Sequence, residues 1–191
     1  MEFSRVHPDL EGLKALAHPT RIRILTLLRL DGPATATTLA RRLDLNTGAT
    51  SYHLRHLARH GFAVEDSDRG NARDRWWKAA HSSTWTEDEK FTDPEGREAL
   101  DAFIQAAAVN QNLALQTAVE ERPLLSDQWR HASTVSDWMY RLTPERAREL
   151  VERITAVFDD FDDMDAPDAV PFRLQYAGFP VPGRLEPDTE T

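Results

Sequence analysis

Residues 45–62 read LNTGATSYHLRHLARHGF and decide the fold that we predict for this chain. The stretch has the spacing of one helix, in which successive residues turn by about 100°. On such a helix Thr50, Leu54 and Leu57 share one side, with His53 at its edge. The other side carries small or polar residues, namely Gly48, Ser51, Tyr52, Arg55 and Arg59. A metal ion, a substrate or a nucleic acid would each account for part of this polar side. The flanking sequence distinguishes between these three kinds of partner.

Three further helices are predicted upstream of this stretch. A short amphipathic segment covers residues 9–17, and Pro19 then opens TRIRILTLLRL, whose apolar residues recur at helical spacing. Thr35 is a suitable N-cap for the third helix, at about residues 36–43. Only residues 44–46 separate that helix from the next one. Two short helices joined by so few residues cross steeply, which predicts a helix-turn-helix.

A β-hairpin is predicted directly after the helix-turn-helix. Residues 62–80 read FAVEDSDRGNARDRWWKAA, in which an alternating strand, a loop with Gly70 and Asn71, and a second strand follow one another. Arg69 and Arg73 flank the tip of this hairpin, with Arg75 just beyond. In this position a hairpin forms the wing of a winged helix. Its arginines can reach a phosphate or the minor groove, although tip arginines are also often merely solvated.

The polar side of residues 47–60 has the chemistry that a DNA major groove requires. Small residues near the helix start allow close approach, a hydroxyl can bond phosphate or base edges, and an arginine can bond guanine O6 and N7. A solvated helix face is the alternative interpretation. Because the predicted wing and this face support each other, the sequence favours nucleic acid.

The charge of the chain is divided unevenly along its length. Residues 1–82 carry 13 Lys and Arg against nine Asp and Glu, whereas residues 83–191 carry 10 against 23, for a net charge of −9. This division predicts that contact with a polyanion is confined to the first half. The chain has no cysteine, no apolar run near the roughly 20 residues needed to cross a bilayer, and no secretory pattern at its start. We therefore expect a cytoplasmic protein without membrane contact.

These segments together resemble a known family. The runs LKALAHPTRIRILTLL (residues 13–28) and TTLARRLDLNTGATSYHLRHLARHGF (residues 37–62), followed by the wing, are similar to the ArsR family of winged helix-turn-helix regulators over about residues 10–82. The resemblance implies that the first turns of the recognition helix read an operator. By motif position this role falls on Thr47, Gly48, Ser51 and Tyr52, and the face argument adds Arg55. Asp44 stands where many members have glycine, and we expect the turn to survive because aspartate tolerates a left-handed conformation.

The metal-sensing sites of that family are not expected here. Without cysteine there is no thiolate site, and residues 97–121 contain no histidine for a zinc site on a C-terminal helix. His56 and His60 are four residues apart and could bind a metal in principle. We favour ordinary polar residues at the end of a helix, where histidine suits the dipole. The prediction is no metal and no cofactor.

The second half of the chain is predicted to be helical after a polar linker at residues 81–93. One helix runs from Pro94 to about residue 121, with a stripe formed by Leu100, Phe103, Ile104, Ala107, Ala114 and Ala118. Others cover roughly residues 127–142 and 143–161. Our hypothesis is that these helices form a C2 dimer. A bundle that completes only its own core is the alternative.

Two features of the second half are candidate ligand sites. Trp129, Trp138, Tyr140 and Phe158 could line a pocket for an unknown small-molecule effector, although aromatic residues at helical spacing are more often core. The acidic run DDFDDMDAPD at residues 159–168 lacks the glycine and terminal glutamate of a calcium loop. It indicates a solvated exit into the tail.

The sequence therefore predicts a mainly α protein with a small β-hairpin wing. Residues 1–85 form a winged helix-turn-helix DNA-binding domain, residues 86–165 a helical dimerisation and effector region, and residues 166–191 a Pro-rich acidic tail. The predicted function is a transcriptional regulator, a repressor that binds double-stranded DNA as a homodimer, with residues 47–60 in the major groove and wing residues 67–74 on the backbone or in the minor groove. A winged-helix module for protein contact is the alternative. No catalytic constellation supports an enzyme, and the operator and inducer are not specified.

Overall fold

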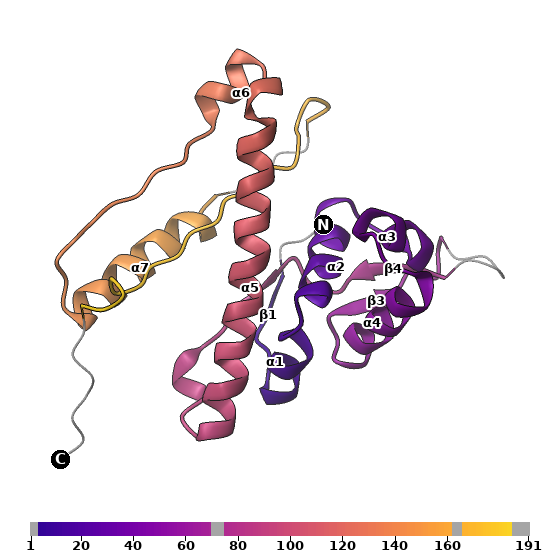
Figure 1. Ribbon diagram of the computed structural model, residues 1–191, viewed down its shortest axis with the longest axis horizontal. Helices are drawn as coiled ribbons and strands as arrows, with labels where there is room; N and C mark the ends of the chain where they lie inside the picture. The colour runs from indigo at the N-terminus through magenta and orange to yellow at the C-terminus, as the bar shows by residue number, and fades with distance from the viewer. Residues whose placement is uncertain (1–3, 70–74, 162–165, 185–191) are drawn as a thin grey trace. The chain divides into compact units, whose positions relative to one another are not determined.

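The computed structural model describes residues 4–69, 75–161 and 166–184. It divides into two compact units, Met1–Leu124 and Leu125–Thr191. The first unit contains the predicted winged helix together with a long helix that follows it (Figure 1). No helix among the described residues is both long enough and apolar enough to cross a bilayer.

The winged helix has the predicted element order. Its helices are α1 (Leu10–Leu16), α2 (Pro19–Leu30), α3 (Ala36–Leu43) and α4 (Thr47–Arg59), and its strands are β2 (Ala34–Thr35), β3 (Ala63–Glu65) and β4 (Trp76–Ala79). The strands form one antiparallel sheet in the order β2-β4-β3. Side-chain caps begin the helices: the hydroxyl of Thr35 accepts from the Thr38 amide at 3.1 Å, which confirms the predicted N-cap of α3.

The core of the winged helix forms where the helices meet the sheet. Thr50, Leu54 and Leu57 of α4 are fully buried, as their helical spacing predicted. They pack in one cluster with apolar residues of the other elements, among them Ile24, Leu28, Leu39, Phe62 and Trp77. Burial of these side chains fixes which face of α4 remains outside.

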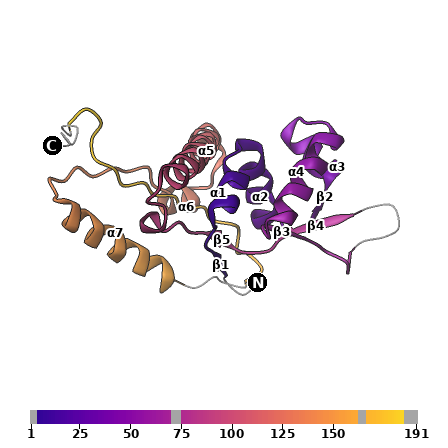
Figure 2. The ribbon, with the colours of Figure 1, turned by 90° about the horizontal axis from the view of Figure 1, so that it is seen from below.

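Residues 81–93, predicted to be a linker, are instead built onto the first unit. Within them β5 (Ser83–Thr84) pairs in parallel with β1 (Arg5–Val6), a strand that the sequence analysis missed (Figure 2). Arg29 of α2 holds this segment, because its Nε donates to the carbonyl of His81 and its Nη2 to Thr84 Oγ1, both at 2.9 Å. Burial lowers the pKa of the Arg29 guanidinium to about 10. A short 3₁₀ turn, η1 (Asp88–Lys90), then leads to α5.

The long helix α5 (Pro94–Glu121) lies beside α1 and α2 (Figures 1 and 2). Leu13 of α1 is buried against Phe91, Ala99 and Leu100. The buried face of α5 ends at Asn110, whose amide donates to Thr26 Oγ1 at 3.4 Å. Because α5 packs on the winged helix, the first compact unit runs to Leu124, well beyond residue 85.

The predicted stripe on α5 was partly wrong. Leu100 is buried and Phe103, Ala107 and Ala114 are half-buried, but Ile104 is 45% exposed and Ala118 is exposed. At 100° per residue the buried face is centred near Gly96, Phe103 and Asn110, so Ile104 lies to one side of it. A turn named η2 (Arg122–Leu124) ends this unit.

The second unit contains α6 (Asp127–Ala132) and α7 (Pro144–Asp159). The prediction of a helix over residues 127–142 was wrong, because residues 133–143 are not helical. The sequence at the break, Ser133 to Ser136, consists of hydroxyl and β-branched side chains, which favour local bonds and extended backbone over helix. The start of α7 is as predicted, with Thr143 as its N-cap.

An extended segment, residues 166–184, accompanies α7. The ring of Tyr176 lies 5.1 Å from that of Phe158, and its hydroxyl is 3.0 Å from Thr155 Oγ1. None of the described residues of this unit is buried. The described part of the second unit therefore contains no apolar core.

Candidate nucleic-acid interface

The outward face of α4 is formed by the residues predicted to read DNA. Thr47, Gly48, Tyr52 and Arg55 are exposed and Ser51 is half-buried. Tyr52, at 57% exposure, is the largest of these side chains. Since Thr50, Leu54 and Leu57 hold the opposite face in the core, these five residues lie on one surface.

The start of α4 combines a cap with open space. Asn46 Oδ1 accepts from the amide of Ala49 at 2.7 Å, which satisfies one of the unpaired amides of the first turn. A Cβ at Gly48 would lie 3.3 Å from this Asn46 Oδ1. Glycine therefore leaves the capping oxygen uncrowded and allows close approach to the helix start.

The turn between α3 and α4 depends on one strained residue. Asp44 has φ 54° and ψ 49°, the left-handed region, and it alone among the described non-glycine residues has a positive φ. The amides of both Asp44 and Leu45 donate to the carbonyl of Ala40. The expectation that aspartate preserves this turn is confirmed.

Two arginines of the wing, Arg69 and Arg75, each lie close to a carboxylate. Arg69 is exposed, and its Nε lies 3.6 Å from the carboxylate of buried Asp66, which also lies 3.2 Å from Lys78 Nζ. Arg75 lies 3.2 Å from Glu65 and over the Trp77 ring. Arg73 belongs to residues 70–74, which lie outside the described residues, as does that part of the predicted wing contact.

On the flank of α4 lies a group of side chains that we call the histidine cluster: His18, Arg21, His53, His56 and His60. The sequence pointed to the histidines of α4, but it gave no indication that His18 and Arg21 of α2 join them. The His18 and His53 rings lie 4.8 Å apart, and the His56 and His60 rings stack at 4.9 Å. The available signal was the spacing of the three α4 histidines on one side of the helix, but their proximity to α2 follows only from the fold. In the described part of the chain, no group of three or more His, Cys, Asp or Glu side chains is arranged to hold a metal.

Burial and neighbouring basic groups lower the pKa values of three histidines of this cluster, His18, His53 and His56. Burial lowers the pKa of His53 below its usual value, and His18, Arg21 and His56 lower it further. Burial likewise lowers the pKa of His56, followed by the effects of Arg21, His60, Arg59 and His18. His18 Nδ1 accepts from the Thr20 amide at 3.1 Å, so that nitrogen carries no proton while it caps α2.

The aromatic residues proposed as an effector pocket are not brought together. The Trp129 ring lies 6.3 Å from that of Phe172, and Phe158 contacts Tyr176. Trp138 and Tyr140 lie in the extended stretch after α6 and are 72% and 63% exposed. The assumed helix through residue 142 was what placed them on a common surface.

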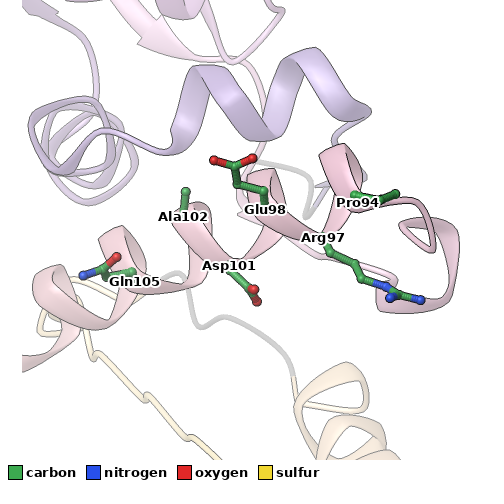
Figure 3. Close-up of a pocket in the computed structure, with 6 residues that line it drawn as sticks. All are labelled: Pro94, Arg97, Glu98, Asp101, Ala102 and Gln105. Atoms are coloured by element: carbon green, nitrogen blue, oxygen red, sulfur yellow. The ribbon is translucent and has the colours of Figure 1, made fainter. Parts of the chain in front are cut away.

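A shallow hollow follows the first turns of α5 (Figure 3). Its lining comes from one helix: Pro94, Arg97, Glu98, Asp101, Ala102 and Gln105. The lining is largely charged and polar, and side chains of a single helix do not enclose a ligand. This hollow adds no site to the interface.

Comparison with known proteins agrees with the fold. Residues 16–66 match the model of a helix-turn-helix domain family. No curated protein matches the chain. With its sheet and wing, the chain is a winged helix-turn-helix protein, a class that includes DNA-binding transcriptional regulators. The resemblance recognised in the sequence is confirmed at this level.

Several solved structures are similar to parts of the chain. Reduced HlyU from Vibrio cholerae is 27% identical over 47% of this chain and 77% of its own, with a TM-score of 0.31. A possible transcriptional regulator for arsenical resistance is 26% identical over 55% of this chain and 93% of its own, with a TM-score of 0.32. AdcR from Streptococcus pyogenes is 15% identical over 74% and 78%, with a TM-score of 0.31.

Proposed function

We propose that this chain is a transcriptional repressor of the ArsR type that binds operator DNA as a homodimer in the cytoplasm. The observation that carries the proposal is the outward face of α4. Exposed Thr47, Gly48, Tyr52 and Arg55 project from a helix whose opposite face is locked in the core. An α-helix presented in this way fits the major groove.

Each side chain of the face has a separate role in this proposal. Arg55 bonds the O6 and N7 of a guanine, and Tyr52 contacts a neighbouring base edge or methyl group. Ser51 and Thr47 bond phosphate or base edges, and Gly48 lets the helix start approach the backbone. Arg69 and Arg73 of the wing contact phosphates or the minor groove.

The homodimer is proposed to form through α5. Helix α5 exposes an apolar set, of which the last three lie beyond the part covered by α1 and α2: Ile104, Val109, Leu113, Leu115 and Val119. Val109 and Val119 are each 51% exposed. Exposed apolar side chains along one helix are typical of an interaction surface, and a second copy presents the same residues in a two-fold arrangement.

DNA binding is tested with operator fragments selected from random duplexes by the full chain. Arg55→Ala and Tyr52→Ala are each expected to lose roughly 1–3 kcal/mol for the selected operator, about 5- to 150-fold in affinity, and to relax base preference. Arg73→Ala is expected to weaken all duplexes similarly, because a phosphate contact carries no base information. Arg97→Ala, on α5, is the matched control and should leave binding unchanged.

Salt dependence separates this function from a module for protein contact. The logarithm of the affinity should fall linearly with the logarithm of the salt concentration. The two half-sites of the operator should have their centres about 10 base pairs, or a multiple of that, apart. Affinity that is independent of salt would exclude phosphate contact. Equal loss of base preference from Arg73→Ala would reverse the roles of wing and helix.

A further inference from the structure

The histidine cluster joins two helices beside the face that we assign to DNA. His18 and Arg21 come from the start of α2, and His53, His56 and His60 from α4. All five side chains are half-buried. The ring of Tyr52, a residue of the proposed DNA-reading face, lies 5.5 Å from His53 and 6.1 Å from His56. The cluster therefore borders that face directly.

The cluster contains basic groups without acidic ones. The groups that act on the pKa values of His18, His53 and His56 from α2 and α4 are Arg21, Arg59 and the histidines themselves. From α1, Lys14 contributes its carbonyl, which accepts from Arg21 Nη2 at 3.3 Å, while its ammonium is paired with Glu11 and Glu95. Among the described residues of α1, α3 and β3, which also pack on α4, no carboxylate acts on these histidines.

Three nitrogen atoms of the cluster lack a hydrogen-bond partner. Arg21 Nε, His53 Nδ1 and His56 Nδ1 are shielded from solvent, and within the described residues each has no partner. Polar atoms in this condition are costly, and an incoming acceptor or anion lowers that cost. The guanidinium of Arg21 is also poorly solvated, and this burial lowers its pKa.

Geometry limits which anion can reach this place. On a helix that turns about 100° per residue, His53, His56 and His60 lie between the buried face and the outward face of α4. When the outward face sits in a major groove, the flanks of the helix meet the phosphate walls of that groove. A backbone phosphodiester is the anion that arrives there with the DNA.

We propose that the histidine cluster is a binding site for a DNA backbone phosphate, and that His53 and His56 take up protons when it is filled. This inference rests on the proposed function, since the phosphate belongs to the bound operator. The phosphate supplies the missing negative charge and favours the imidazolium form. No covalent change occurs, and the protons come from solvent.

Proton uptake on DNA binding makes the affinity depend on pH in one direction. A histidine that binds its proton more tightly in the complex than in the free protein raises DNA affinity as the pH falls. The rise approaches about tenfold per pH unit for each proton taken up. The lowered pKa values of the free protein act on its stability in the opposite direction, because these histidines have the ordinary pKa of about 6.5 in the unfolded chain and accept protons more readily there. Stability of the free fold is therefore lost as the pH falls below about that value.

The test measures affinity of the full chain for its selected operator from pH 8 down to pH 6, at constant ionic strength with a chelator present. We expect wild type to gain about fivefold or more over this range. His56→Gln should lose much of the gain, so that the ratio of its affinities at pH 6 and pH 8 is smaller than that of wild type. His131→Gln, which removes a histidine on α6, is the matched control and should keep the full gain. Calorimetry in buffers of different ionisation enthalpy should show protons entering the wild-type complex.

Each outcome decides between the proposals. Operator binding that is flat with pH, or that takes up no protons, overturns the phosphate site and leaves the proposed function standing. Absence of operator binding at every pH overturns the proposed function itself. If millimolar inorganic phosphate at matched ionic strength removed the pH dependence, the cluster would hold a free anion and not the DNA backbone. Circular dichroism at each pH shows that the fold is intact.

Discussion

At the scale of single residues, Asp44 determines the angle between α3 and α4. Its left-handed backbone lets the chain reverse within residues 44–46 and brings Asn46 to the start of α4. A left-handed conformation costs most residues roughly 1–2 kcal/mol, and aspartate less, because its short polar side chain can bond locally. Glycine adopts the conformation without that cost.

The stability of Asp44 variants should therefore follow how readily the new residue adopts the left-handed conformation. We expect Asp44→Gly to raise the free energy of unfolding by up to about 1 kcal/mol, and Asp44→Ala to lower it by about 1 kcal/mol. Asp44→Asn, which removes the charge alone, should stay close to wild type. Urea denaturation gives the three values, and equal stability of the alanine and glycine variants would contradict the argument.

At the scale of elements, the first turn of α4 contributes both to stability and to the proposed DNA contact. The Asn46 cap orders the first turn, which contains Thr47 and Gly48. Because those residues form part of the proposed DNA face, a frayed first turn would lose both stability and affinity. A capping residue with a negative charge separates the effect on stability from the effect on DNA affinity.

The cap variants Asn46→Ala and Asn46→Asp make that separation. Asn46→Ala should cost about 1 kcal/mol of unfolding free energy and weaken operator binding. Asn46→Asp keeps an equally good cap, so stability should remain near wild type, but its carboxylate repels phosphate and binding should weaken at low salt. Thermal denaturation and operator titration are measured on the same samples. Full affinity in the aspartate variant would place the helix start away from DNA.

At the scale of the whole molecule, α5 has two faces with different duties. Leu100 completes the core of the first unit against Leu13 and Phe91. Leu115, beyond the covered part, is exposed in a single chain. One helix thus both finishes the DNA-binding unit and offers the proposed dimer surface.

Substitutions on the two faces of α5 should act on different equilibria. Leu100→Ala is expected to lower unfolding stability by about 2–5 kcal/mol, because it leaves a cavity in the core. Leu115→Glu should change the stability of the isolated chain little but shift the dimer to monomer in sedimentation. A dimer that survives Leu115→Glu, with operator affinity intact, would exclude this part of α5 as the interface.

The sequence by itself determined the elements whose signals are local. Helical spacing of Leu54 and Leu57, the Thr35 cap and the short turn at 44–46 each depend on neighbouring residues only, so α3, α4 and the hairpin strands could be predicted, as could the residues on the outward face of α4. Local reasoning failed at residues 133–142, where a helix was predicted although hydroxyl and β-branched side chains oppose it.

Only the tertiary structure decided which distant segments meet. The pairing of β1 with β5, the attachment of residues 81–84 by Arg29 and the packing of α5 on α1 join residues far apart in the chain. The histidine cluster is of the same kind, since His18 and His53 are 35 positions apart and approach only when α2 and α4 cross. Such contacts depend on how faces of several helices share one core, and helical spacing within a single segment carries no information about them.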